Sequence, residues 1–270
     1  MDSIIEVVRC FENSNIIHVD GVINPINDIE IIELELIYAD LETVSKRRER
    51  VKKQLKADKS LAKEDQILEK IEKTLNEGKS ARSIEFTKEE KEIIKGLHLL
   101  TLKPLMYVAN VDEETIQNPE SNENFKKVKQ YAESQNAKVI PICVKLEEEI
   151  SELESEEEKK EFLEMMGLDK SGLDRLVIAS YDILGLMSYL TAGEVEVRAW
   201  TIRKGTKAPQ AAGKIHSDIE RGFIKAEIVS YDDLIKCGSM AKAREKGLIR
   251  MEGKEYTMKE GDIVDFKFNV

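Results

Sequence analysis

The chain has 270 residues, of which 41% are hydrophobic and 35% charged, and its formal net charge is −11. This length fits one large domain or two ordinary ones, and the composition is that of a globular protein rich in surface helix. A strongly acidic chain is a poor general binder of nucleic acid, so any such contact must be local. Residues 190–270 carry 15 basic and 13 acidic side chains, which makes the C-terminal part the better match for a polyanion.

Cysteine spacing and the absence of long apolar runs indicate the cellular compartment of the protein. Cys10, Cys143 and Cys237 match no zinc or redox motif, and three is an odd number for a disulfide framework. No apolar run reaches the length of a membrane span, and the first residues lack the regions of a signal peptide. These features predict a cytoplasmic protein with no metal site and no membrane segment.

A strand and a helical hairpin are the first predicted elements. Residues 4–11 are mostly apolar and β-branched, which favours a strand, and residues 19–25 form a loop. Two heptad seams then predict a coiled-coil-like antiparallel pair of helices, the second ended by Gly78. A capping box at Thr87 opens a third helix through Leu100, on which we expect His98 to pack. The hairpin is either a protruding arm that docks a partner or a packed insertion. The seams consist of Leu34, Ile37, Leu41, Val44, Arg48, Val51 and Leu55, and of Leu61, Leu68, Ile71 and Leu75.

Residues 104–110 predict a buried strand of a parallel sheet. The strand delivers Asn110 and Glu113 to its carboxyl end, where open α/β sheets bind ligands. Asn110-Val111-Asp112-Glu113 resembles the base-reading motif of P-loop nucleotide hydrolases, in which an amide and a carboxylate bond the edge of the base. It departs from the guanine-reading form Asn-Lys-x-Asp at Val111 and Glu113. The alternative interpretation is a helix start that Asn110 or Asp112 caps.

The remaining pattern predicts an α/β region followed by a different module. A helix over about 121–136, a buried strand over 137–143, helices from Leu146 and Ser155, and an apolar helix over 173–189 complete the first part. Strands over 194–202, 223–229, 248–251, 256–258 and 263–268 alternate with short helices and predict a β-grasp module. We expect the region from Gly193 onward to fold alone.

Several stretches together carry a resemblance that covers the whole chain. They include residues 7–12, 28–30, 110–113, 142–147, 198–201 and 253–256, and the two strongest are Ala211-Ala212-Gly213-Lys214-Ile215-His216 and Phe266-Lys267-Phe268-Asn269-Val270. On these residues the chain resembles the YchF family, the Obg-related P-loop ATPases that carry a TGS domain.

The resemblance implies a fold and a set of sites. It implies part of a Ras-like P-loop domain, strands 4, 5 and 6 of its sheet, in residues 1–27 and 101–190. It also implies an inserted antiparallel helical hairpin in 28–100 and a β-grasp TGS domain in 191–270. The expected ligand is ATP, preferred over GTP, and the expected partner is the ribosome. The implied base site comprises Asn110, Val111, Glu113, Cys143, Val144 and Lys145, in which Cys143 is a buried small residue rather than a redox switch.

A basic cluster and a missing motif leave two function classes open. The basic cluster is either a solvated face or a contact with ribosomal RNA phosphates, and it comprises Arg198, Arg203, Lys204, Lys207, Lys214 and Arg221. No G-x-x-x-x-G-K-[ST] stretch, which would hold phosphates and Mg²⁺, occurs in the sequence. We therefore expect an N-terminally truncated chain that does not hydrolyse ATP alone. It is either the base-binding part of an ATPase that uses Mg²⁺ only with the absent segment, or a non-catalytic adaptor that docks on the ribosome.

Overall fold

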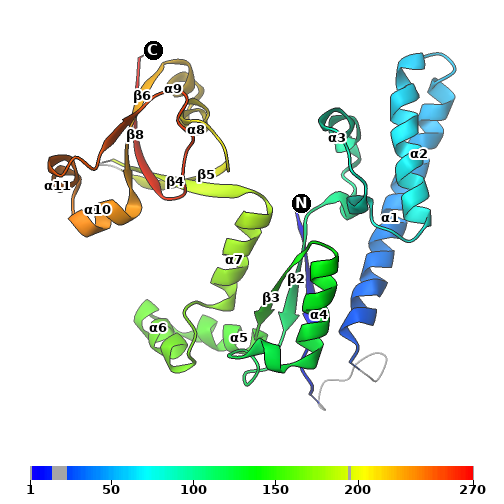
Figure 1. Cartoon of the computed structure of the whole chain (residues 1–270), viewed down its shortest axis with the longest axis horizontal. Helices are drawn as coiled ribbons and strands as arrows, with labels where there is room; N and C mark the ends of the chain where they lie inside the picture. The colour runs from blue at the N-terminus through cyan, green and yellow to red at the C-terminus, as the bar shows by residue number, and fades with distance from the viewer. Residues whose placement is uncertain (1, 14–22, 194–195, 270) are drawn as a thin grey trace. The chain divides into compact units, whose positions relative to one another are not determined.

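The computed structural model describes residues 2–13, 23–193 and 196–269 and divides into two compact units, Met1–Ser180 and Tyr181–Val270. Each unit is built around its own sheet (Figure 1). The division falls ahead of the predicted boundary between residues 190 and 191. Most of the predicted loop over residues 19–25 lies outside the described residues, as do Glu194 and Val195 of the predicted strand over 194–202.

The first unit contains a three-stranded parallel sheet in the order β1-β2-β3. Its strands are β1 (Ile4–Arg9), β2 (Leu105–Asn110) and β3 (Lys138–Ile142). The central strand β2 is buried from Leu105 to Ala109, as expected for a parallel strand with both faces covered. In this register Arg9 lies beside Asn110 and Asn110 beside Ile142. The loops that follow all three strands therefore meet at one edge of the sheet.

Helices lie against both faces of this sheet (Figure 1). The start of α1 (Pro25–Gln54) and α4 (Glu123–Ser134) pack on one face. On the other side lie α5 (Val144–Glu152), α6 (Glu156–Met165) and α7 (Gly172–Ile183). The sequence pattern predicted α4, α5 and α6 correctly, including the Ser155 capping box of α6. The hydrophobic core is formed by Val8, Cys10, Ile29, Leu105, Tyr107, Ala109, Val111, Ile116, Phe125, Val128, Ala132, Cys143 and Leu146.

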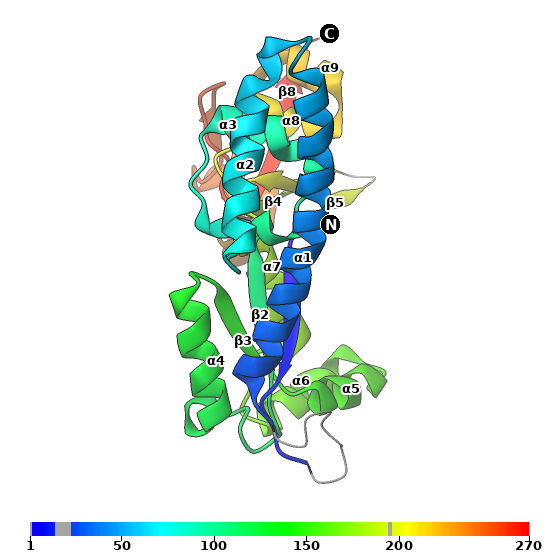
Figure 2. The same ribbon diagram turned by 90° about the vertical axis from the view of Figure 1, so that its right-hand side faces the viewer.

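The predicted helical hairpin is confirmed as α1 packed against α2 (Ala62–Asn76), and Figure 2 shows the two helices side by side. Arg48 enters the seam and pairs with three acids of α2, Asp65 at 3.3 Å, Glu72 at 2.6 Å and Glu69. Gly78 takes a positive φ of 73° just after α2 ends, which a residue with a side chain rarely adopts. One seam position is wrong: Leu34 is 42% exposed, because in this antiparallel register it lies beyond the end of α2.

Two carboxylates hold the hairpin to the rest of the first unit. Glu33 of α1 accepts from Tyr131 of α4 at 3.1 Å and pairs with Arg82 at 3.3 Å. Asp40 of α1 is 3% exposed and binds the start of the 3-10 helix Leu100–Leu102. These contacts connect α1 with α4, with Arg82 in the segment after α2, and with the 3-10 helix Leu100–Leu102.

The third helix is shorter than predicted. Thr87 forms its capping box with Glu90, but α3 spans only Lys88–Ile94 and gives way to the 3-10 helix Lys95–Leu97. His98 follows with a positive φ of 51° and is exposed, so the prediction that it packs on its helix is wrong. The chain turns here instead of continuing the helix, and this turn places the 3-10 helix Leu100–Leu102 against Asp40.

Glu6, in the middle of β1, introduces a dependence of stability on pH. Burial and the negative charge of Glu33 raise the pKa of Glu6 from 4.5 to about 7, against an opposing effect of Arg82 and with a smaller contribution from Asp28. The folded chain therefore holds more protons than the unfolded chain between pH 4.5 and 7. The free energy of unfolding is expected to fall as pH rises through this window.

Comparing the parent with Glu6→Gln isolates this effect. In urea unfolding, we expect the free energy of unfolding to fall between pH 5 and pH 8 by about 1–2 kcal/mol more in the parent than in the variant. This range allows for solvent near the half-buried Glu6 side chain. Glu123→Gln, at an exposed site on α4, is the matched control and retains the parent's pH profile. Identical pH profiles for the parent and Glu6→Gln would contradict the assignment.

The second unit is a mixed five-stranded sheet in the order β5-β4-β8-β6-β7. Its strands are β4 (Leu186–Ala192), β5 (Val197–Arg203), β6 (Phe223–Ser230), β7 (Arg250–Glu252) and β8 (Asp262–Phe268). Four helices accompany the sheet: α8 (Ala208–Ile215), α9 (Ser217–Arg221), α10 (Tyr231–Cys237) and α11 (Met240–Glu245). β4 and β8 pair in parallel, and the other neighbours are antiparallel.

One predicted element of this region is too long, and another is largely missing. The apolar helix predicted over 173–189 ends at Ile183; Gly185 then takes a positive φ of 62°, and the chain enters β4. The predicted strand over 256–258 is reduced to an isolated bridge between Lys207 and Thr257. The core of the second unit draws on β4 and consists of Met187, Tyr189, Ile202, Ala208, Ala211, Ala212, Phe223, Ala226, Ile228, Met258, Val264 and Phe266.

Candidate functional site

A cavity of about 690 Å³ lies at the carboxyl edge of the three-stranded sheet. All six residues predicted to surround a base line it, so the structure brings the two predicted loops together. Sequence reasoning missed the third loop, which follows β1, and the acidic residues beside the motif. The parallel pairing of β1 with β2 is the signal that could have revealed that loop. The lining residues are Phe11, Glu12, Asn13, Asn110, Val111, Asp112, Glu113, Glu114, Cys143, Val144, Lys145 and Glu148.

The β1 loop is held in place from two sides. Arg9 lies over the ring of Phe11, 4.7 Å from its centroid, and its Nε donates to the Phe11 carbonyl at 3.2 Å. Asn122, at the start of α4, donates to the Cys10 carbonyl at 3.0 Å. The half-buried Phe11 ring is therefore fixed at the wall of the cavity.

Asn110 connects the loops after β2 and β3. Its side-chain oxygen accepts from the backbone N–H of Val144 at 3.2 Å. The amide NH₂ group of Asn110 thus remains the donor for a ligand. The carboxylate of Asp112 accepts from the Thr115 N–H at 2.8 Å and stabilises the turn after the strand. Residues 113–117 form this turn and not the helix start of the alternative interpretation.

Glu113 and Lys145 form an ion pair between the same two loops. Their side chains are 40% and 68% exposed, and the hydrogen bond that Lys145 donates to Glu113 raises the pKa of Lys145. Val111 lies behind them and is only 2% exposed, so it packs in the core and shapes the wall from below.

Cys143 occupies the position before α5 and is 3% exposed. Burial raises the pKa of its thiol, opposed by nearby backbone N–H groups, and burial likewise raises the pKa of Cys10 to about 12. Both thiols are protonated at neutral pH, whereas reactive cysteines are exposed thiolates. The prediction of Cys143 as a small buried residue fits this environment.

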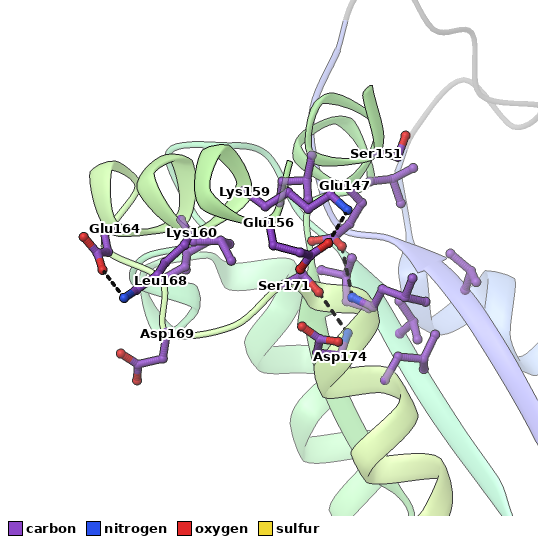
Figure 3. A pocket seen from close by; sticks show the side chains of 18 of the residues that line it. Glu147, Ser151, Glu156, Lys159, Lys160, Glu164, Leu168, Asp169, Ser171 and Asp174 are labelled. Atoms are coloured by element: carbon purple, nitrogen blue, oxygen red, sulfur yellow. Dashed lines mark hydrogen bonds and ion pairs between the residues drawn. The ribbon is translucent and has the colours of Figure 1, made fainter. Parts of the chain in front are cut away.

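A second cavity of about 850 Å³ lies on the face of the sheet that α5, α6 and α7 accompany (Figure 3). Its floor is apolar and includes Ile5, Val7 and Val108. The charges at its rim are largely engaged: Lys159 pairs with Glu156, and Glu147 accepts from the Gly172 N–H at 2.6 Å. This cavity lacks a set of converging polar groups that would recognise a polar ligand.

The predicted basic residues of the second unit are all exposed but spread over β5, the following turn, α8 and α9. Four of them are paired with acids: Arg198 with Glu196, Lys204 with Asp182, Lys207 with Glu255 and Arg221 with Asp218. Trp200 is half-buried, donates to Thr191 at 2.9 Å and lies beneath Arg198. Such pairing lowers the positive charge available to a polyanion.

Two kinds of site do not occur in the part of the chain that the structure describes. No group of three or more His, Cys, Asp or Glu side chains could hold a metal ion there. None of the described helices is long and apolar enough to cross a membrane.

The fold belongs to the α/β class and matches solved structures of GTP-binding proteins. A structure of the Schizosaccharomyces pombe YchF GTPase superposes with a TM-score of 0.80 and 39% sequence identity, over 98% of this chain and 72% of that chain. A GTP binding protein from Pyrococcus horikoshii OT3, 20% identical, matches 99% of this chain and 79% of its own with a TM-score of 0.59. The second match shows the fold alone.

Sequence relatives identify the family. The "Ribosome-binding ATPase YchF" of Bacillus subtilis (strain 168) is 55% identical over 271 residues, which cover 100% of this chain and 74% of the relative. The protein of the same name from Escherichia coli O157:H7 is 46% identical, over 100% and 73%. The family model YchF-GTPase_C, described as a protein of unknown function (DUF933), matches residues 186–269. The chain belongs to the YchF family.

Proposed function

We propose that this chain is the purine-nucleotide-binding part of a ribosome-associated ATPase of the YchF type, with ATP preferred over GTP. The observation that carries the proposal is the cavity at the carboxyl edge of the sheet, where Asn110 links two of the three surrounding loops. A purine base enters there, and the Asn110 amide donates to the edge of the base. The Phe11 ring offers an apolar wall for the base.

The charge of the cavity favours a base over phosphates. Five acids line it, and Lys145 is the only cation among its described lining residues. A neutral base tolerates such a wall, whereas a triphosphate is repelled by it. The described residues do not fit Mg²⁺ with phosphates, so hydrolysis requires a phosphate-binding loop that this sequence does not contain. The five acids are Glu12, Asp112, Glu113, Glu114 and Glu148.

The domain assignment follows from the same reasoning. The sheet of the first unit represents strands 4, 5 and 6 of a Ras-like P-loop domain, and α1 to α3 form the helical insertion. The second unit is a TGS domain that starts with β4. The names of the relatives support a ribosome partner and hence a cytoplasmic location. The chain would then dock through the hairpin and through the basic residues of the second unit.

A titration with AMP tests the base site. We expect AMP to shift the proton–nitrogen signals of Val144 and of the Asn110 side chain, and Asn110→Ala to weaken binding at least about fivefold because a good hydrogen bond contributes about 1 kcal/mol or more. The matched control is Asn76→Ala, because the Asn76 side chain donates to the Glu72 carbonyl at 2.8 Å and does not line the cavity. In the same preparation, ATP is expected to release no phosphate at a steady rate.

Three results would contradict the proposal. They are unchanged signals around the cavity at millimolar AMP, an Asn110→Ala variant that binds as the parent does, and ATP turnover that survives further purification. An adaptor without nucleotide binding is the second candidate. The exposed basic residues of the second unit favour it, and ribosome binding that persists in a chain unable to bind AMP would support it.

A further inference from the structure

The ion pair between Glu113 and Lys145 changes which hydrogen-bond acceptors the base-reading motif can offer to a ligand. Glu113 is the carboxylate at the fourth position of the motif, and Lys145 holds its Oε1 atom from the first turn of α5. Lys145 lies 3.9 Å from Glu149, so Glu113 is its nearer acid. One carboxylate oxygen of Glu113 therefore already carries the lysine ammonium when a ligand arrives, and a ligand donor at this oxygen competes with Lys145.

The two purines present different hydrogen-bond donors to this carboxylate. Guanine presents N1–H and the N2 amino group side by side, and it is bound best when both carboxylate oxygens accept at once. Adenine offers a single donor, its N6 amino group, beside the acceptor N1. The other oxygen of Glu113 is enough for adenine, whereas the paired contact to guanine also needs Oε1, where guanine competes with the lysine.

We propose that Lys145 is a specificity-determining residue that disfavours guanine by competing with it for one carboxylate oxygen of Glu113. The inference rests on the proposed base site and assigns the preference for adenine to a pair of residues instead of to Glu113 alone. It is a case of specificity obtained by making the wrong ligand displace an existing contact. No other described cation lines the cavity that could replace Lys145.

The expected effect is modest because both side chains are partly exposed. Exposed ion pairs contribute little, so displacing the lysine is expected to weaken guanine binding about three- to fivefold. Lys145→Met keeps the apolar stem and removes the charge, and it is expected to raise the affinity for GMP relative to that for AMP by this factor. Lys145→Arg restores the cation and with it the parent's preference.

The experiment is a titration of the full chain with AMP and GMP, followed at the Val144 amide. Lys129→Met is the matched control, because Lys129 also forms a surface pair, with Glu120, outside the cavity. An AMP-to-GMP affinity ratio that is the same in the parent, Lys145→Met and Lys145→Arg would overturn the inference while leaving the base site intact. If neither nucleotide shifts Val144 in the parent, the proposed base site itself fails.

Discussion

Replacing Asp40 with alanine is expected to lower the free energy of unfolding of the first unit by about 3–5 kcal/mol, the range for breaking a buried charged network. The Asp40 carboxylate accepts three hydrogen bonds, from the backbone N–H of Leu100 and of Thr101 at 2.7 Å each and from the Thr101 hydroxyl at 2.6 Å. Thr101 is fully buried, and its hydroxyl oxygen accepts in turn from the Ala81 N–H at 3.1 Å. Removal of the carboxylate leaves these donors without a partner.

Urea unfolding followed by circular dichroism measures this effect. Asp58→Ala is the control: Asp58 also accepts from a backbone N–H, that of Ser60 at 2.9 Å, but it is exposed, so its loss is expected to cost only about 1 kcal/mol. Asp40→Asn is expected to fall between the two, because an amide keeps one acceptor and turns a second donor toward Thr101. A loss below about 1 kcal/mol in Asp40→Ala would show that Asp40 does not hold the hairpin in place.

Elements whose stability comes from residues close in sequence could be predicted. The spacing of Ile37, Val44 and Val51 on α1 repeats on α2 in Leu68, Ile71 and Leu75, and these six residues are buried as expected. The capping boxes at Thr87 and Ser155 form with the partners that their spacing indicates. Such patterns depend on helix geometry alone.

The region around Met187 shows where local reasoning fails. Its apolar residues recur at helical spacing, yet residues 186–192 form a strand whose partners lie at 197–203 and at 263. Pairing with β8 involves residues more than seventy positions away. Helix and strand cannot be distinguished by the period of a short apolar run, and a partner so distant leaves no local trace.

The candidate site was predictable in part. Because parallel strands end at the same edge, a motif after β2 and a loop after β3 had to meet, and Asn110 and Val144 do so. The engagement of Glu113 by Lys145 depends on where two long side chains lie, which no spacing rule provides. The Phe11 loop was missed because its residues match no motif by themselves.

A polypeptide spanning residues 181–270 is expected to fold alone, whereas one spanning 193–270 is not. This differs from the prediction for the region from Gly193 onward, which omits β4. β4 pairs with β5 over its whole length and with β8, and it separates these two strands in the sheet. It also places Met187 and Tyr189 in the core, where they are 3% and 0% exposed.

Without β4, the second unit is expected to lose more free energy of unfolding than a unit of this size can lose and still fold. Removing two large buried side chains costs about 2–5 kcal/mol each, against a total stability of about 5–15 kcal/mol for a typical domain. The comparison is made with proton–nitrogen correlation spectra, where we expect wide dispersion for 181–270 and collapsed signals for 193–270. Tyr189→Phe within 181–270 removes only the hydroxyl that donates to the Ala211 carbonyl at 2.8 Å, and this control retains a dispersed spectrum. A well-dispersed spectrum for 193–270 would show that β4 is dispensable, and the second unit would then begin at the position that the sequence pattern predicts.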